Sequence, residues 1–159
     1  MIYNNLKIFS QNVHKNVLIA NTILETHSHF NIILIQEPPW SIVCLIPSSS
    51  SSEGEVLVSV SYHPNWLSFA RPSATQLDFL RVLAYINIHL SSFHFSLHRN
   101  IINHRDILLI SFFSNNICFF IINIYSNTSH STLKYLKNTE MNINNLLIIT
   151  DDFNIRDRL

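Results

Sequence analysis

The sequence contains very little glycine and cysteine. Its 159 residues include one glycine, Gly54, and two cysteines, Cys44 and Cys118. Average usage would supply roughly 7% glycine, so Asn, Ser and Pro must make most of the turns. The two cysteines have neither zinc-type spacing nor partners for a disulfide framework. We therefore expect buried thiols in a reducing, intracellular compartment.

Charge is also scarce, and it is balanced. Charged residues make up 13% of the chain, and ten Lys and Arg offset ten Asp and Glu. This balance excludes a sequence-wide basic surface for nucleic acid, so any affinity for phosphate must be local or supplied by a metal. The start, MIYNNLKIF, lacks the order of a signal peptide. The 47% hydrophobic content predicts one packed domain over residues 1–159.

The longest apolar segment, 107–125, is nearly as long as a membrane helix. Polar residues 114–116 stand at its centre, where they would be costly in a bilayer. We therefore predict an antiparallel hairpin of strands 107–113 and 118–125, with the two Asn of the polar group in the turn. A membrane-associated helix is the alternative.

The first third of the chain predicts a strand, a helix and a second strand. Residues 6–12 and 32–36 are strand-like runs, and apolar residues recur at helical spacing over 17–24. A crossover of this kind makes the two strands parallel, so their C-terminal ends lie at one edge of the sheet. Asn12 and Glu37 stand at those ends, and we expect them to meet.

The remainder predicts a second group of elements. A short helix near 132–141 would have Ser131 as its cap and turn Leu133 and Leu136 inward. No repeat is visible. We also expect a low-complexity loop at 48–54, strands at 56–62, 81–88 and 146–150, and a Pro-, Asn- and Ser-bearing connection at 63–73. This order of elements predicts an α/β fold.

Glu37 is the most informative single residue. It follows a strand of core-type residues and precedes two prolines, and proline cannot continue a sheet ladder. A carboxylate in this position suits a hard metal such as Mg²⁺, which takes one or two carboxylates together with water and substrate phosphate. Asn12 gains weight because it ends the neighbouring strand. The alternative is an ordinary exposed acid at a strand end.

Asp152 and Asn154 alternate around Phe153, so both side chains would point the same way from an extended chain. An aspartate can accept a proton from water while an Asn two residues on donates hydrogen bonds to the nucleophile or phosphate. The alternative is an Asx-rich turn, and Asp151 fits either interpretation. Tyr125, which ends its own strand, is either a core residue or a member of the site.

The histidines do not predict a metal centre. His89, His94, His98 and His104 have spacings that fit no single ligand template, and no cluster of cysteines or acids accompanies them. We interpret them as part of a solvated or half-buried face.

Four motifs, taken in order, resemble the endonuclease/exonuclease/phosphatase superfamily, with the greatest likeness to the endonuclease domain of fungal LINE-type (non-LTR) retrotransposons. Each motif is weak alone, but all four follow predicted strands. They are QNV at 11–13, QEPPW at 36–40, NIYSN at 123–127 and DDFNIRD at 151–157.

The resemblance implies the N-terminal part of a two-sheet α/β sandwich and a Mg²⁺- or Mn²⁺-dependent hydrolysis of DNA phosphodiesters. By matching motif, Asn12 and Glu37 would hold the metal. Tyr125 would support the phosphate, and Asp152 and Asn154 would handle the attacking water. A DNA substrate also implies an intracellular, nuclear location with no membrane. The oligomeric state stays open.

Three departures from the family pattern bear on activity. Asp151 replaces the glycine of the family's GDFN motif, and Asn127 follows Tyr125-Ser126 where the family has Tyr-Ala-Pro-Asn. The family's late Ser-Asp-His motif is not found in the 159 residues, so we expect a domain incomplete at its C-terminus and weak or inactive as a nuclease. The alternative is a non-catalytic remnant of a mobile element.

Overall fold

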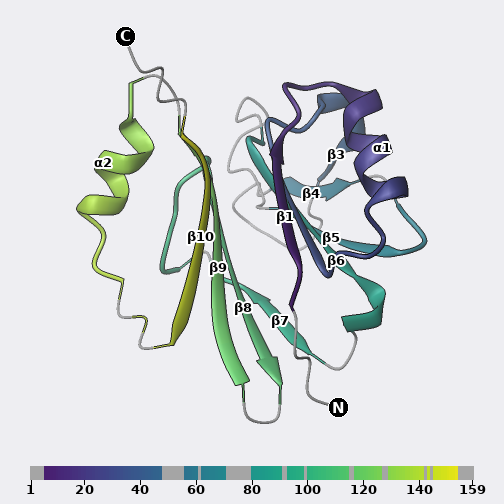
Figure 1. The fold of residues 1–159 in the computed structure, drawn as a ribbon. Helices are drawn as coiled ribbons and strands as arrows, with labels where there is room; N and C mark the ends of the chain where they lie inside the picture. Colours follow the sequence, from purple (N-terminus) through teal and green to yellow (C-terminus); the bar gives the residue numbers. More distant parts are fainter. Residues whose placement is uncertain are drawn as a thin grey trace, which may run out of the picture.

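The computed structural model places two four-stranded sheets face to face, with one helix outside each sheet (Figure 1). The residues that it describes are 6–47, 56–60, 62–70, 80–90, 93–98, 100–114, 117–126, 129–141, 143 and 145–153, with the backbone alone at 44–47, 56–60, 114, 117, 152 and 153.

The first sheet carries the predicted strand, helix and strand. Its parallel pair is joined by the crossover helix α1 (Val17–Thr26), which the Asn16 side chain caps by accepting hydrogen bonds from the backbone N–H groups of Leu18 and Ile19. In spatial order the sheet contains β1 (Ile8–Asn12), β2 (Ile32–Gln36), β6 (Val82–Asn87) and β5 (Trp66–Ala70). The predicted parallel arrangement of 6–12 and 32–36 is confirmed.

The second sheet contains the predicted hairpin. In spatial order it consists of β10 (Leu146–Phe153), β9 (Ile117–Ser126), β8 (Ile107–Ser114) and β7 (His94–Leu97). Strands β8 and β9 are antiparallel with Ser114 opposite Ile117, so the predicted strands are confirmed. The turn residues Asn115 and Asn116 lie outside the described part. Within that part, no helix is long and apolar enough to cross a membrane.

The two sheets and the helix outside each of them form four layers, and a hydrophobic cluster lies between each neighbouring pair of layers. Along β2, Ile32 and Leu34 face the second sheet, whereas Ile33 and Ile35 face α1, as the two-residue period of a strand requires. A third cluster between the second sheet and α2 (Ser131–Lys137) includes Leu109 on β8. The result is an α/β sandwich, which confirms the predicted fold class.

The helix α2 differs from its prediction. It ends at Lys137 rather than near 141, and Ser131 is its first residue instead of its cap. The capping position is His130, which has a left-handed backbone and makes no side-chain capping hydrogen bond. Leu133 and Leu136 are half-buried, and the fully buried residue of the helix is Thr132.

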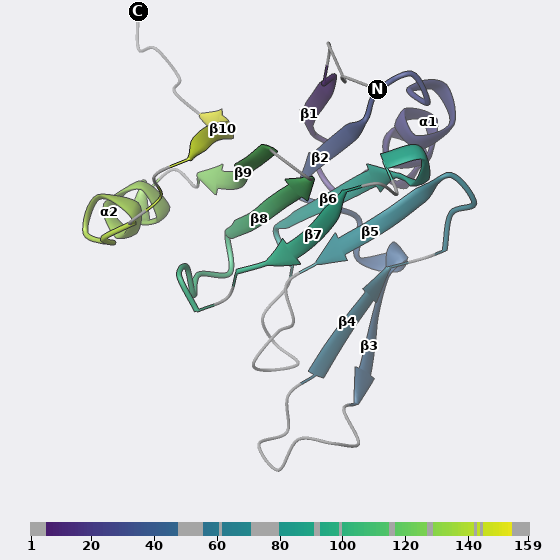
Figure 2. The same ribbon diagram turned by 90° about the horizontal axis from the view of Figure 1, so that it is seen from below.

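The sequence patterns missed two strands of the sheets and one strand of a separate hairpin. Strand β5 lies inside the predicted connection 63–73, and β7 was not predicted. In β5 the exposed Leu67 breaks the apolar alternation, while the buried Trp66 donates its indole N–H to the Leu24 carbonyl 3.0 Å away. The hairpin of β3 (Val43–Pro47) and β4 (Val56–Val60) projects away from both sheets in Figure 2.

Shorter differences concern strand ends and the cysteines. Strand β6 stops at Asn87, where a 3-10 helix, η2 (Ile88–Leu90), begins. Strand β10 runs three residues beyond the predicted end at Thr150. Cys118 is a free, half-buried thiol, whereas the side chain of Cys44 and the loop 48–54 lie outside the described part.

Candidate functional site

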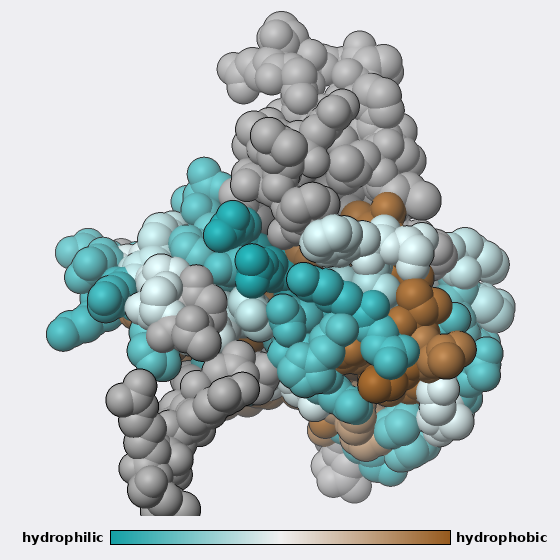
Figure 3. Space-filling model, turned by 90° about the horizontal axis from the view of Figure 1, so that it is seen from above, coloured by the Kyte–Doolittle hydropathy of each residue, from teal (hydrophilic) through white to brown (hydrophobic). Residues whose placement is uncertain are grey.

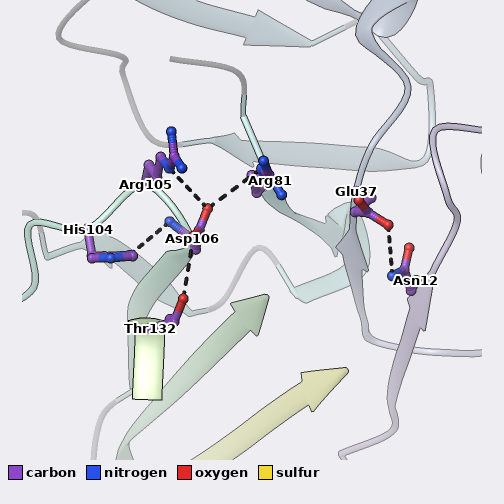
Figure 4. A network of polar contacts seen from close by, with 7 residues as sticks. All are labelled: Asn12, Glu37, Arg81, His104, Arg105, Asp106 and Thr132. Carbon is purple, nitrogen blue, oxygen red and sulfur yellow. Dashed lines mark hydrogen bonds and ion pairs between the residues drawn. The ribbon is translucent and has the colours of Figure 1, made fainter. Parts of the chain in front are cut away.

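The parallel pair of the first sheet brings Asn12 and Glu37 together. Asn12 is the last residue of β1 and pairs with Gln36, the last residue of β2, so Glu37 follows directly beside it. The Asn12 amide Nδ2 donates to the Glu37 carboxylate Oε2 at 3.1 Å (Figure 4). The expected meeting of these two side chains is confirmed, while their role as metal ligands stays a prediction.

The backbone around Glu37 is strained and firmly held. Glu37 has φ 46°, and His14 and Lys15 in the facing loop have φ 48° and 61°. These are three of the four non-glycine residues with positive φ in the described part. The N–H of Lys15 donates to the Glu37 carbonyl, and the N–H of Glu37 donates to the Arg81 carbonyl, each at 2.8 Å. Such backbone conformations gather at functional sites, where surrounding contacts maintain them.

The Glu37 carboxylate is kept ionised. Burial by itself raises its pKa, but hydrogen bonds from Asn12, Tyr125 and His14 and the nearby charge of Lys15 outweigh the burial, so its pKa lies below the ordinary value. The His14 ring Nδ1 is 3.3 Å from Oε2. An ionised carboxylate is the kind of ligand that a hard divalent cation prefers.

Tyr125 reaches the same carboxylate from the second sheet. Burial, followed by the charge and the hydrogen bond of Glu37, raises the pKa of the phenol, and Arg81 partly offsets this. The phenol therefore keeps its proton near neutral pH and donates to Glu37. The Arg81 guanidinium carbon lies 5.0 Å from the centre of the tyrosine ring. Tyr125 is thus buried and hydrogen-bonded to Glu37, while its role toward the phosphate stays a prediction.

A buried acid that the sequence patterns did not identify supports Arg81. Asp106 lies just before β8, with Oδ1 3.9 Å from the Arg81 Nε and 3.6 Å from the Arg105 Nε. Its Oδ2 accepts a hydrogen bond from the Thr132 hydroxyl at 3.4 Å, and its carbonyl accepts from the Tyr125 N–H at 2.9 Å. Figure 4 shows Arg81 between this group and the Asn12–Glu37 pair.

A polar bridge beneath the site joins the two sheets. The Gln36 side-chain Nε2 donates to the Asn123 Oδ1 at 2.6 Å, and the Asn123 Nδ2 donates to the carbonyls of Ile35 at 3.2 Å and Leu83 at 3.0 Å. Both amide side chains are buried. Gln36 belongs to the QEPPW motif and Asn123 to the NIYSN motif. In the sequence, the only sign of a hydrogen bond between the sheets was that each is a polar residue beside apolar ones.

The structure places the DDFN motif only in part. Asp152 pairs with Tyr125 in the register of β10 and β9, and the chain stays extended through Phe153. The chain is therefore a strand, not an Asx-rich turn, as far as Phe153. Asp151 is half-buried in the strand. The side chain of Asp152 and all of Asn127 and Asn154 lie outside the described part, so the catalytic roles of Asp152 and Asn154 stay predictions.

The site offers a cation few ligands from the protein. In the described ranges no group of three or more His, Cys, Asp or Glu residues is arranged to hold a metal ion. Glu37 supplies one ionised carboxylate and Asn12 one amide, which suits Mg²⁺ because this ion keeps several waters and uses substrate phosphate. Two of the four histidines considered earlier have local partners: His98 contacts the Ser111 hydroxyl at 2.7 Å, and the His104 ring lies tilted against Tyr135, with 4.7 Å between the ring centres.

No protein-family model matches the chain, and no curated protein matches it either. Among solved structures the chain is similar to the endonuclease domain of TRAS1, a telomere-specific non-LTR retrotransposon, at 14% sequence identity and a TM-score of 0.49. The alignment covers 84% of this chain and 51% of that one, so the chain spans about half the length of the TRAS1 domain. A likeness at this level does not identify the chemistry of the site.

Proposed function

We propose that the chain is a metal-dependent phosphodiesterase that nicks DNA and derives from the endonuclease of a LINE-type (non-LTR) retrotransposon, of the fungal kind that its four motifs resemble. The observation that supports this most directly is the Glu37 carboxylate. Asn12 from the adjacent strand and Tyr125 from the opposite sheet both donate hydrogen bonds to it. An ordinary surface carboxylate is hydrated by water and does not need hydrogen-bond donors from two separate sheets.

The proposed metal is Mg²⁺ or Mn²⁺, held by Glu37 with Asn12 beside it. When bound, the ion would stabilise the charge that develops on the phosphate oxygens. Asn12 orients the carboxylate through the 3.1 Å hydrogen bond, and its own Oδ1 accepts the backbone N–H of His14 at 2.8 Å. This pair of bonds fixes the amide, so the carboxylate is presented in one orientation.

Tyr125 has two proposed tasks. Its protonated phenol restrains Glu37, and it lies where a hydrogen bond to the phosphate of the substrate is within reach. Arg81, with its guanidinium against the tyrosine ring, adds a positive charge to the second-sheet side of the site. Arg81 and Tyr125 together favour an anionic substrate there.

Asp152 and Asn154 complete the proposal from β10. Asp152 would accept a proton from the attacking water, and Asn154 would donate hydrogen bonds that orient the water or phosphate. The pairing of Asp152 with Tyr125 supports this role, because it brings the backbone of the motif beside Tyr125. We expect weak activity, because Asp151 replaces the glycine that allows close backbone approach in the GDFN motif. Its pairing with Ile124 puts its side chain on the α2 face of the sheet, away from Tyr125.

The test is nicking of supercoiled plasmid in Mg²⁺ or Mn²⁺ by the wild-type chain and by Glu37→Gln. We expect slow nicking that falls by about a hundredfold or more in the variant. The control is Glu25→Gln, which removes an exposed carboxylate from α1 and should leave nicking unchanged. Mn²⁺ binding followed by electron paramagnetic resonance gives a second readout, and it should weaken in Glu37→Gln alone.

The non-catalytic alternative makes the opposite prediction. If the wild-type chain neither binds Mn²⁺ nor nicks DNA, and Glu37→Gln changes neither result, the protein is a folded remnant without the proposed activity. Equal nicking by wild type and Glu37→Gln would also contradict the proposal, because the activity would then come from another site or a contaminant.

A further inference from the structure

Two loops beside Glu37 bring a lysine and a tryptophan together. Lys15 belongs to the loop after β1, and Trp40 begins the 3-10 helix η1 (Trp40–Ile42) after β2. The Lys15 Nζ lies 4.9 Å from the centre of the Trp40 ring. We call these two side chains the Lys15–Trp40 rim. Because both loops start at the strand ends that carry Asn12 and Glu37, the rim borders the candidate site.

Both halves of the rim are held in place by the backbone. The loop with Lys15 is closed by the Asn16 N–H, which donates to the Val13 carbonyl at 2.8 Å, and Lys15 itself is tied to the Glu37 carbonyl. On the other side, buried Pro39 precedes Trp40, and buried Ile42 follows it. The rim therefore keeps a defined position relative to Glu37.

The exposure of the rim is difficult to explain by folding alone. The chain has two tryptophans. Trp66 is 3% exposed, whereas Trp40 is 50% exposed, although a large aromatic side chain contributes most to stability when buried. Figure 3 looks onto the face where β1 and β2 end and shows a band of hydrophilic residues across its middle, with hydrophobic residues gathered to one side. A lysine on an exposed tryptophan places a cation and an aromatic surface where β1 and β2 end.

We propose that the Lys15–Trp40 rim is a DNA contact, in which Lys15 binds a backbone phosphate next to the cleaved one and Trp40 packs against the neighbouring sugar or base. This inference rests on the proposed function, because DNA is the partner assumed there. A lysine over a tryptophan ring keeps N–H groups for a phosphate, and aromatic rings beside cations are the usual surface for nucleotides. The rim would add a positive charge on the first-sheet side of Glu37, opposite Arg81.

The experiment uses the intrinsic fluorescence of the two tryptophans. Wild-type protein is titrated with a short DNA duplex that has a single-stranded overhang, in EDTA so that no cleavage occurs. Because Trp66 is buried, DNA should leave its emission unchanged. We expect DNA to quench the emission of Trp40 in the wild type, and Trp40→Phe should lose this quenching. We expect Trp40→Ala to weaken binding by about five- to tenfold, which is the lower part of the range for a stacked base.

Lys15→Gln tests the phosphate contact separately. Removing one phosphate contact should lower the slope of log Kd against log salt by about 0.9. The matched control is Lys7→Gln, because Lys7 is exposed and precedes β1, at the opposite end of that strand from the site. A reduced slope in Lys15→Gln together with an unchanged slope in Lys7→Gln supports the rim.

The outcomes separate this inference from the proposed function. Quenching that persists in Trp40→Phe, or equal salt slopes for all three proteins, overturns the rim even if the protein nicks DNA. Quenching by DNA in a protein that does not nick contradicts the phosphodiesterase while the rim stands. Tighter binding of an RNA hairpin than of the DNA duplex overturns the assignment of the partner as DNA.

Discussion

The two sheets of this protein have the same strand arrangement, but their edge strands and helices differ in burial and capping. Each consists of a parallel pair extended by two antiparallel strands. In the first sheet, the edge strand β1 exposes Ser10 but no apolar side chain, and α1 is capped by a side chain. In the second, the edge strand β10 exposes 67% of Leu146 and 55% of Ile149, and α2 has seven residues and no side-chain cap.

Because of this difference, one half of the candidate site lies on the more stable sheet, and the other half depends on the docking of the less stable sheet. Asn12, Glu37 and Arg81 belong to the well-covered first sheet, whereas Tyr125 and Asp106 belong to the second. The hydrogen bond between Tyr125 and Glu37 therefore requires that the sheets stay docked. A change that loosens the second sheet should reduce activity before it unfolds the first sheet.

The largest difference in the free energy of unfolding should come from alanine substitutions on the inner faces of the two sheets. Leu34 on β2 is fully buried between the sheets, and Ile148 on β10 is half-buried against the same core. We expect Leu34→Ala to lower the free energy of unfolding by about 2–5 kcal/mol. Ile148→Ala should cost less, because part of its surface is already in water. Urea denaturation would measure both, and equal losses would contradict the inequality of the sheets.

The polar bridge between the sheets should give the next largest effect. Asn123→Leu removes one of the two acceptors of the buried Gln36 amide, the other being the Ser10 hydroxyl at 3.0 Å, and it removes the donor to two carbonyls. Leaving such groups unsatisfied should cost about 2–3 kcal/mol.

A double-mutant cycle sharpens this prediction. If the two amides act as a pair, Gln36→Leu combined with Asn123→Leu should cost less than the sum of the single changes, because the apolar pair leaves no orphaned side-chain amide. Strict additivity in denaturation experiments would show that they contribute separately.

The two helices should respond differently at their first turns. Asn16→Ala removes the hydrogen bonds to the N–H groups of Leu18 and Ile19 and should cost about 1 kcal/mol. His130→Gly removes a residue with φ 53° and no capping side-chain bond, so stability should be unchanged or slightly higher, since glycine favours this conformation. Thermal unfolding of both variants measures the difference, and a clear loss in His130→Gly would contradict it.

The smallest effect should appear in the dependence of stability on pH. The pKa of Glu37 is below its ordinary value of 4.5 in the folded protein, so ionised Glu37 stabilises the fold above that value, and this contribution disappears as the pH falls through the lower, folded pKa. The difference in unfolding free energy between wild type and Glu37→Gln should therefore be constant above about pH 5.5 and shrink in acid. A difference that grew in acid would reverse the sign of the shift.

Much of the first sheet could be predicted because its signals are local. The apolar run 32–36 and the helical spacing after residue 16 predict a parallel pair, and this pair brings Asn12 to Glu37. Strand β5 was missed because the exposed Leu67 breaks the alternation of polar and apolar residues, and β7 was missed because its regular alternation covers only four residues. Only spatial contacts could reveal the pairing of Arg81 with Asp106, since 25 residues of chain separate an ordinary arginine from an ordinary aspartate.

The left-handed backbone at Glu37 has a consequence for how this position responds to selection. Glycine and asparagine adopt φ 46° with less strain than glutamate, so selection for folding alone would favour them over glutamate at this position. Selection for phosphate chemistry would favour the carboxylate. A library of all residues at position 37, sorted once for abundance and once for nicking, should therefore rank glutamate differently in the two sorts, and the gap between the ranks measures how far function overrides backbone preference.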